Sequence, residues 1–182
     1  MKIKEIYLTV LFFPFFVYAS IFNSSSIVHP EVDKNGMVVS QHYLASSVGA
    51  QILKDGGNAY DASIAVAFAL AVVLPRAGNI GGGGFMVMYD EKTNKTFSID
   101  YREKAPALAS KDMYLNDDGT VNKKRAREGI LSIGVPGTVY GMWEVHKKFG
   151  SLPWKTLLEP AIKLAEEGFI MSPFMVCLLY TS

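Results

Sequence analysis

Residues 62–74 are apolar at every position except Ser63, and Pro75 follows them directly. Alanine recurs five times within this segment. A helix that is apolar all round is buried all round, and its alanines let neighbouring elements approach closely. The segment is shorter than the roughly 20 residues needed to cross a bilayer. It therefore predicts a central helix that the rest of the chain covers on several sides.

A second apolar stretch, Phe85–Tyr89, predicts a β-strand covered on both faces, because both of its alternating faces are apolar. Residues 90–95 predict a hairpin loop and residues 96–102 the returning strand. That strand has an apolar face and a polar face, formed by Phe97, Ile99 and Tyr101 and by Ser98, Asp100 and Arg102, respectively. Helices packed against an antiparallel sheet, an α+β arrangement, are expected.

Local signals place the other helices. Ser40 is a good N-cap for a helix that carries Leu44, Val48 and Ile52 on one face and ends at Gly56–Gly57. Asn58 and Asp61 give the start signal of the central helix. Two later helices are expected, one from about residue 139 to Gly150 and one opened by Ser151 and Pro153 that ends at Gly168. Residues 103–132 are polar and rich in turn residues, which predicts an irregular segment.

Residues 1–19 predict a secretory signal peptide that is cleaved after Ala19, because lysines precede a short apolar stretch that ends in a small residue. The alternative is a membrane anchor that is never cut. Cleavage removes two lysines and one glutamate, which leaves a neutral mature chain. Residues 20–36 then form a flexible lead-in. We expect the mature protein to be secreted or periplasmic, without a stable membrane span.

Composition excludes several classes of function. The 182-residue chain has a formal net charge of +1, so nucleic acid is not an expected partner. One cysteine excludes an internal disulfide framework and a cysteine-based zinc cluster. The three histidines, His29, His42 and His146, lack the spacing of a helical metal site. No cofactor or metal is expected.

The glycines Gly81–Gly84 follow a helix and precede a strand, and no lysine comes after them. A phosphate-binding loop has the opposite order, with the glycines opening a helix. The favoured interpretation is that backbone passes close to other backbone here, or that positive φ angles are needed.

Arg102 is the strongest candidate for a binding residue. It ends a strand on the polar face, and its planar guanidinium suits a carboxylate. The alternative is a solvated salt bridge to Asp100 or Glu103. The remaining candidates are weaker: His146 is interpreted as a core or boundary residue, Ser132 and Thr138 lack a neighbouring histidine, and residues 123–125 are interpreted as a solvated basic loop.

Five segments, spread over residues 37–175, together resemble the gamma-glutamyltranspeptidase family, in its bacterial form. They are Gly56–Ala62, Gly78–Met86, Asp100–Pro106, Gly134–Val139 and Pro160–Ala165. Each segment alone is weak evidence, whereas five in order with matching gaps are specific. The export signal also fits this family.

The resemblance implies an N-terminal nucleophile hydrolase with an αββα sandwich, made as a precursor that cleaves itself. The new N-terminal threonine of the small subunit attacks the γ-glutamyl amide of glutathione or a related compound, and the acyl group passes to water or to an amino acid or peptide. By the same resemblance, Arg102 matches the arginine that binds the substrate α-carboxylate.

The chain also departs from the family pattern. The family's large subunit is about twice as long, and nothing here corresponds to the catalytic threonine, so no catalytic residue is expected within these 182 residues. The expected partners are the remainder of the large subunit and the small subunit of the same precursor. The apolar residues 176–182 replace an expected polar helix, and we expect this tail to be non-native.

Two other functions remain open at this stage. One is an exported module that binds an anion or small molecule through the glycine loop and Arg102, without catalysis. The other is a related acylase, such as a cephalosporin acylase, or a poly-γ-glutamate transpeptidase. The isolated chain is expected to be inactive and to fold poorly, because its central helix and its first strand both need covering layers.

Overall fold

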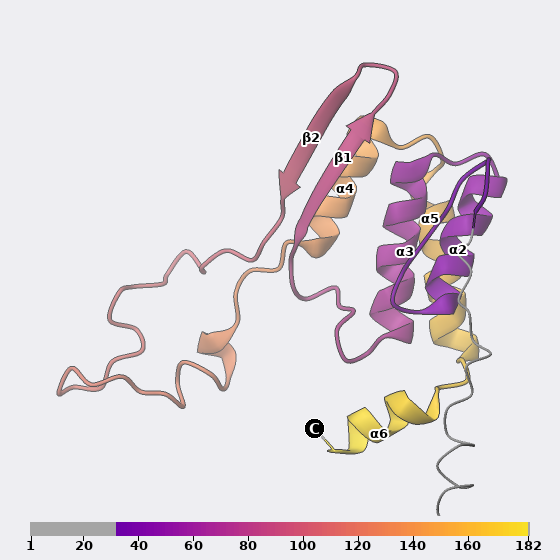
Figure 1. The fold of residues 1–182 in the computed structure, drawn as a ribbon. Helices are drawn as coiled ribbons and strands as arrows, with labels where there is room; N and C mark the ends of the chain where they lie inside the picture. The colour runs from indigo at the N-terminus through magenta and orange to yellow at the C-terminus, as the bar shows by residue number, and fades with distance from the viewer. Residues whose placement is uncertain (1–31, 182) are drawn as a thin grey trace, which may run out of the picture. The chain divides into compact units, whose positions relative to one another are not determined.

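The computed structural model describes residues 32–181, and its contacts separate residues 1–35 from a second unit, Gly36–Ser182. Figure 1 shows the elements of the second unit. They are α2 (Tyr43–Lys54), α3 (Ala59–Val73), β1 (Phe85–Asp90), β2 (Lys95–Asp100), the 3-10 turn η1 (Ile130–Ser132), α4 (Thr138–Phe149), α5 (Trp154–Glu167) and α6 (Pro173–Thr181). The predicted signal peptide and most of the lead-in lie outside the described residues.

The apolar helix α3 is central, as predicted. It contacts α2, α4 and α5 (Figure 1), and every residue from Ile64 to Val73 is buried or half-buried. Its alanines Ala62, Ala65 and Ala69 are buried, so the neighbouring helices lie close to its backbone. Within residues 32–181, no helix combines the length and the apolar character that a membrane crossing requires.

Helix α2 begins two residues later than the serine cap predicts. Its N-cap is His42, whose Nδ1 accepts a hydrogen bond from the backbone N–H of Leu44 at 3.3 Å. The prediction of Ser40 as the cap is wrong, because the Ser40 hydroxyl donates instead to the His42 carbonyl at 2.9 Å. Ser40 therefore fixes the residue that caps the helix, and does not cap it directly.

The start signal of α3 is confirmed. The Asn58 side chain accepts from the backbone N–H groups of Tyr60 and Asp61, and the Asp61 carboxylate accepts from the Asn58 N–H at 3.0 Å, which completes a capping box. Asp61 is completely buried. It also accepts from Ser151 and Leu152, so the same carboxylate ties α3 to the connection between α4 and α5.

The hairpin forms with the predicted turn, and its register pairs Phe85 with Asp100 and Met88 with Phe97. Only one of its faces is covered by the described residues. Met88 is buried in a cluster with Met142 and Val145 of α4. The prediction that β1 is covered on both faces is wrong for this part of the chain, because the side chains on its other face are exposed: Phe85, Val87 and Tyr89.

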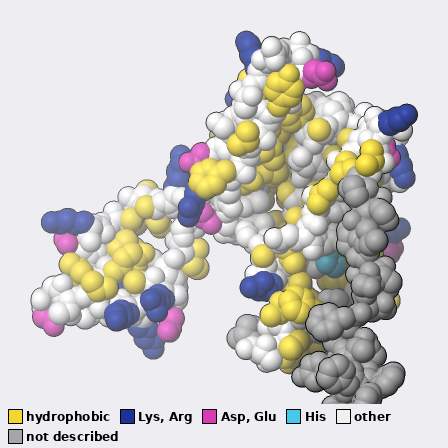
Figure 2. Space-filling model, in the orientation of Figure 1, with side chains coloured by type: hydrophobic (Ala, Val, Ile, Leu, Met, Phe, Trp, Pro, Cys, Tyr) yellow, Lys and Arg dark blue, Asp and Glu magenta, His cyan; other side chains and the backbone are white. Residues whose placement is uncertain are grey.

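Residues 103–132 are irregular, as predicted, apart from η1 and two isolated bridges, one between Lys104 and Val135 and one between Leu115 and Val121. Several large apolar side chains of this segment are exposed, among them Leu108 and Ile130, and Figure 2 shows apolar and charged groups mixed along it. Gly150 ends α4, and Gly168 ends α5 with a φ of 77°, both as predicted. The predicted non-native character of residues 176–182 stays a prediction.

Candidate functional site

Arg102 lies two residues beyond β2, because the strand ends at Asp100 and not at Arg102 as predicted. About 63% of the Arg102 side chain is exposed. Its guanidinium carbon lies 5.8 Å from the centre of the Phe85 ring, within the range of a cation–π contact. Its Nε atom lies 3.8 Å from a carboxylate oxygen of Glu103. Asp100 makes no ion pair with this guanidinium; its carboxylate accepts from the backbone N–H of Arg102 at 2.9 Å.

The glycine loop lies against the backbone that carries Arg102. A Cβ added at Gly83 would lie 2.6 Å from the Tyr101 carbonyl oxygen and 2.7 Å from the Arg102 Cα. A Cβ at Gly137 would lie 1.9 Å from the same carbonyl oxygen. Real Cβ atoms essentially never approach so closely. Three segments that are far apart in the sequence therefore meet at Tyr101–Arg102, and only glycine fits where they cross.

This geometry shows why the loop contains glycine. None of the residues Gly81–Gly84 has a positive φ. Close approach to the backbone of Tyr101 and Arg102 therefore requires glycine at Gly83, whereas a Cβ at Gly81 would meet nothing within 4 Å. The Gly82 carbonyl accepts hydrogen bonds from the N–H groups of Gly137 and Thr138, at 2.8 and 3.0 Å. Those N–H groups at the start of α4 are thus already paired, and the interpretation as a crowded crossing, not a phosphate loop, is confirmed.

Two further contacts hold the backbone around Arg102 in place. Lys104 and Val135 pair in an antiparallel bridge, which holds the segment after Arg102 to the segment before α4. The Tyr101 hydroxyl donates to the Phe85 carbonyl at 3.4 Å. Burial raises the pKa of the Tyr101 phenol above its ordinary value, so this group stays protonated and neutral.

Arg102 can bind a carboxylate in this arrangement. Its contact with Glu103 is made through Nε, and within residues 32–181 its two terminal nitrogens have no acceptor at hydrogen-bond distance. Those two nitrogens form the fork that matches a carboxylate. The side chain is exposed but held from beneath by a ring and from one side by a carboxylate.

The weaker candidates behave as predicted. The His146 Nε2 lies 2.8 Å from the Leu152 carbonyl oxygen, and its ring packs against Trp143 and Trp154, so it is a boundary residue. The Ser132 hydroxyl donates to the Gly129 carbonyl at 2.7 Å. Lys123, Lys124 and Arg125 are exposed, as a solvated basic loop should be.

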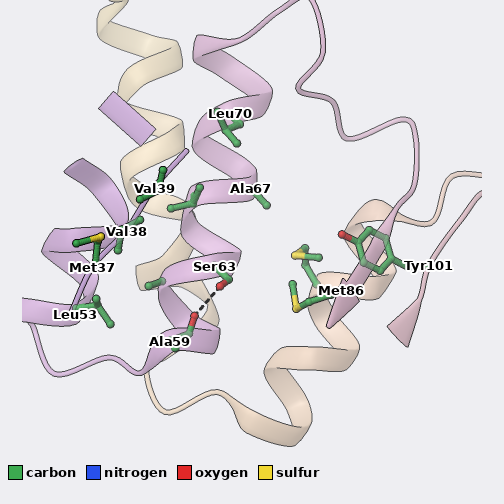
Figure 3. A pocket seen from close by; sticks show the side chains of 13 residues that line it. Met37, Val38, Val39, Leu53, Ala59, Ser63, Ala67, Leu70, Met86 and Tyr101 are labelled. Carbon is green, nitrogen blue, oxygen red and sulfur yellow. Dashed lines mark hydrogen bonds between the residues drawn. The ribbon is translucent and has the colours of Figure 1, made fainter. Parts of the chain in front are cut away.

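A groove of about 420 Å³ lies between residues 37–39, α3 and the start of the hairpin (Figure 3). Its lining is almost wholly apolar: Val38, Leu70 and Met86 are typical members. Ser63 is a polar exception, and its hydroxyl already donates to the Ala59 carbonyl at 2.7 Å. The groove therefore offers no charged group for a carboxylate, which leaves Arg102 as the candidate.

Sequence reasoning missed the place of Phe85 beneath Arg102. The alternation of the strand puts Phe85 and Met86 on opposite faces. Only the register shows that Phe85 lies across from Asp100, and only the side-chain contact shows that its ring lies against the Arg102 guanidinium. It also missed the second role of Asp61, whose partners lie 90 positions away.

The sequence model of the family described as Gamma-glutamyltranspeptidase matches residues 45–180, about three quarters of the chain. The chain belongs to the gamma-glutamyltranspeptidase family. This family membership confirms the resemblance predicted from the five segments, three of which meet at Arg102.

Curated members of the gamma-glutamyltranspeptidase family are similar over most of the chain. A glutathione hydrolase proenzyme of Pseudomonas sp. (strain A14) is 51% identical over 149 residues, which is 82% of this chain and 26% of the relative. The glutathione hydrolase proenzyme of Escherichia coli is 47% identical, over 80% of this chain and 25% of the relative. The chain thus spans about a quarter of the length of these relatives.

Solved structures agree with the fold. The gamma-glutamyltranspeptidase of Helicobacter pylori matches with a TM-score of 0.79 and 46% identity, over 84% of this chain and 43% of that one. The cephalosporin acylase of Bacillus halodurans matches with a TM-score of 0.65 and 31% identity, over 85% of this chain and 29% of that one. The chain is therefore a mixed helix and sheet portion of the gamma-glutamyltranspeptidase fold, and the predicted α+β class is confirmed.

Proposed function

We propose that this chain serves a glutathione hydrolase or γ-glutamyltransferase, and that its Arg102 binds the α-carboxylate of the γ-glutamyl donor. The observation that carries the proposal is the exposed guanidinium fork at the crossing of three family segments. The fork is fixed at its base and open at its end, as recognition of a planar anion requires.

The chemical step needs a nucleophile that is activated by a neighbouring base. Among residues 32–181, the hydroxyls of Ser132 and Ser151 donate to the Gly129 carbonyl and to the Asp61 carboxylate, and neither is hydrogen-bonded to a histidine. We propose that an N-terminal threonine of the precursor's small subunit supplies the nucleophile, forms the acyl-enzyme and passes the glutamyl group to water or to an amino acid or peptide. This chain would then supply binding and not bond cleavage, and the chain alone should release nothing from a γ-glutamyl anilide.

We further propose that the protein works outside the cytoplasm, in the periplasm or as a secreted enzyme, after cleavage of residues 1–19. Its partners would be the remainder of the large subunit and the small subunit of the same precursor. The support is the export signal in the sequence and the word proenzyme in the names of the Pseudomonas and Escherichia coli relatives.

The test uses a chimeric precursor, in which residues 37–175 of this chain replace the matching segment of the Pseudomonas relative. We expect Arg102→Ala to raise the KM for a γ-glutamyl anilide strongly, because truncating a charge-assisted pair costs about 2–5 kcal/mol. Arg102→Lys keeps the charge but loses the two-pronged guanidinium, so its KM should lie between that of the parent enzyme and that of Arg102→Ala. Self-cleavage should be spared, since that reaction acts on the precursor's own peptide bond.

The matched control is Arg127→Ala, which removes an exposed arginine of the irregular segment. A solvated salt bridge to Glu103 predicts a change below about 1 kcal/mol on losing Arg102. If KM and kcat of the matured Arg102→Ala enzyme match those of the Arg127→Ala control, the proposed role of Arg102 is wrong.

A related acylase or poly-γ-glutamate transpeptidase is the second candidate, because the cephalosporin acylase and the transpeptidase CapD of Bacillus anthracis share the fold at 31% and 36% identity. The glutathione hydrolases reach 52% identity, which favours the first proposal. Rates of the chimeric precursor on a γ-glutamyl anilide and on a cephalosporin amide would separate the two.

A further inference from the structure

We propose that Phe85 and Asp100, the residue pair at the open end of the hairpin, are positioning residues that hold Arg102 ready for a carboxylate. Phe85 acts on the guanidinium through its ring, and Asp100 acts on the backbone through its carboxylate. The inference rests on the proposed function of Arg102 and adds to it the groups that aim the fork.

Asp100 controls the direction in which the chain leaves β2. It is the last residue of the strand, and its Oδ1 accepts from the backbone N–H of Arg102 at 2.9 Å. A side chain that accepts from the N–H two residues later forms a tight local turn. This turn places the Arg102 Cα against Gly83, and its side chain on the outer face of the hairpin. Asp100 thus fixes the position of the Arg102 backbone.

Phe85 fixes the position of the Arg102 guanidinium. The register sets Phe85 directly opposite Asp100, and the Arg102 guanidinium carbon lies 5.8 Å from its ring centre. An arginine side chain is long and loses much rotamer freedom when a ligand immobilises it. A ring that already holds the guanidinium removes part of that loss before the ligand arrives.

The same contact leaves the binding groups free. An aromatic ring attracts a cation through the face of the ring. It does not accept the N–H groups that point outward in the plane of the guanidinium. Glu103 contacts only Nε. The two terminal nitrogens therefore stay open while the group is held, which a hydrogen-bonding partner in place of Phe85 would not permit.

The outer face of β1 also offers an internal comparison. Val87 lies on the same face, two residues further along the strand, and is more exposed than Phe85. Val87 pairs with Ser98, whereas Phe85 pairs with Asp100, whose carboxylate forms the turn at Arg102. An effect of general apolar surface should therefore appear at Val87 as well, whereas a positioning effect should appear only at Phe85.

The experiment measures KM and kcat of the matured chimeric precursor with a γ-glutamyl anilide. Phe85→Leu removes the ring, and we expect KM to rise about two- to five-fold at constant kcat. Phe85→Tyr restores the ring and should restore KM. Val87→Leu is the control and should leave KM unchanged. Asp100→Ala should raise KM about two- to ten-fold, while Asp100→Asn, which keeps the acceptor oxygen, should stay within about two-fold of the parent.

A double variant separates positioning from structure. In the Arg102→Ala background, Phe85→Leu should have no further effect on KM, because the group that it positions is gone. If Phe85→Leu raises KM equally in both backgrounds, or if Phe85→Tyr fails to restore it, the inference is wrong. Should Phe85→Leu fail to mature, Phe85→Met gives the same comparison with a long apolar side chain that has no ring.

The two proposals fail in different ways. A raised KM in Arg102→Ala with an unchanged KM in Phe85→Leu and in Asp100→Ala would overturn the positioning inference and leave the proposed function standing. An unchanged KM in Arg102→Ala would overturn the proposed function and, with it, the inference.

Discussion

The buried carboxylate of Asp61 accepts hydrogen bonds from both the backbone N–H and the hydroxyl of Ser151, which lies 90 positions later in the chain. The same carboxylate closes the capping box at the start of α3. The Asn58 side chain supports the arrangement by donating to the Phe149 carbonyl at 2.7 Å. One local helix-start motif therefore also joins the first half of the chain to the connection between α4 and α5.

Asp61→Ala should destabilise the chimeric precursor by about 2–4 kcal/mol, because it removes a buried carboxylate and leaves the partly buried N–H groups of Asn58, Ser151 and Leu152 without this acceptor. Asp61→Asn keeps one acceptor oxygen and should cost less. Thermal melting of the purified precursor measures both changes. Asp55→Asn is the control, since Asp55 is exposed and, within residues 32–181, its carboxylate accepts a side-chain hydrogen bond only from the exposed Gln51. Equal melting temperatures for Asp61→Ala and Asp55→Asn would contradict the prediction.

Tyr60→Phe should leave stability unchanged or raise it by up to about 1 kcal/mol. The Tyr60 hydroxyl is buried and, among the described residues, finds no hydrogen-bond partner. Burial raises the pKa of this phenol, as expected for a hydroxyl away from water. Phenylalanine keeps the ring contact with Phe149, whose centre lies 4.7 Å away.

Urea unfolding of the chimeric precursor gives the comparison for Tyr60. Tyr114→Phe is the contrasting variant, because its hydroxyl donates to the Leu131 carbonyl at 2.6 Å and its loss should cost about 1 kcal/mol. A loss of stability in Tyr60→Phe as large as in Tyr114→Phe would show that the Tyr60 hydroxyl has a partner after all.

Local chemistry made part of this structure predictable. Asn58 and Asp61 predict the start of α3 because a capping box needs only residues three apart. The same logic fails at α2, where Ser40 and His42 are both short-range acceptors, and the backbone between them decides which one caps the helix. Arg102 is predictable as an exposed arginine near the end of the returning strand, although that strand ends two residues earlier, at Asp100.

The remaining features depend on contacts that no local pattern contains. The apolar residues of β1 alternate on both sides, so the pattern cannot tell which face the chain covers; here Met88 is buried and Val87 is exposed. The partners of Asp61 and the Phe85 contact of Arg102 require the register and the packing of distant segments. Of these features, the register and the Phe85 contact bear on the Arg102 site.

The isolated chain should fold without a sharp transition. The outer face of the hairpin exposes Phe85, Val87 and Tyr89, and a two-stranded hairpin is marginal when only one face is covered. We expect the expressed 182-residue chain to bind a hydrophobic dye and to melt broadly. A soluble monomer with a sharp cooperative melt would contradict this expectation.

The crossing at Tyr101 predicts opposite outcomes for two neighbouring glycines. Gly83→Ala would place a Cβ 2.6 Å from the Tyr101 carbonyl and 2.7 Å from the Arg102 Cα, so backbone must shift, at a cost of about 1–3 kcal/mol. That shift also moves Arg102, so the KM for a γ-glutamyl anilide should rise in whatever enzyme matures. Gly81→Ala meets nothing within 4 Å and should be silent in both stability and KM. The melting temperature and the KM of the two chimeric precursors test this prediction. Equal melting temperatures and equal KM values for the two variants would show that Gly83 does not set the position of Arg102.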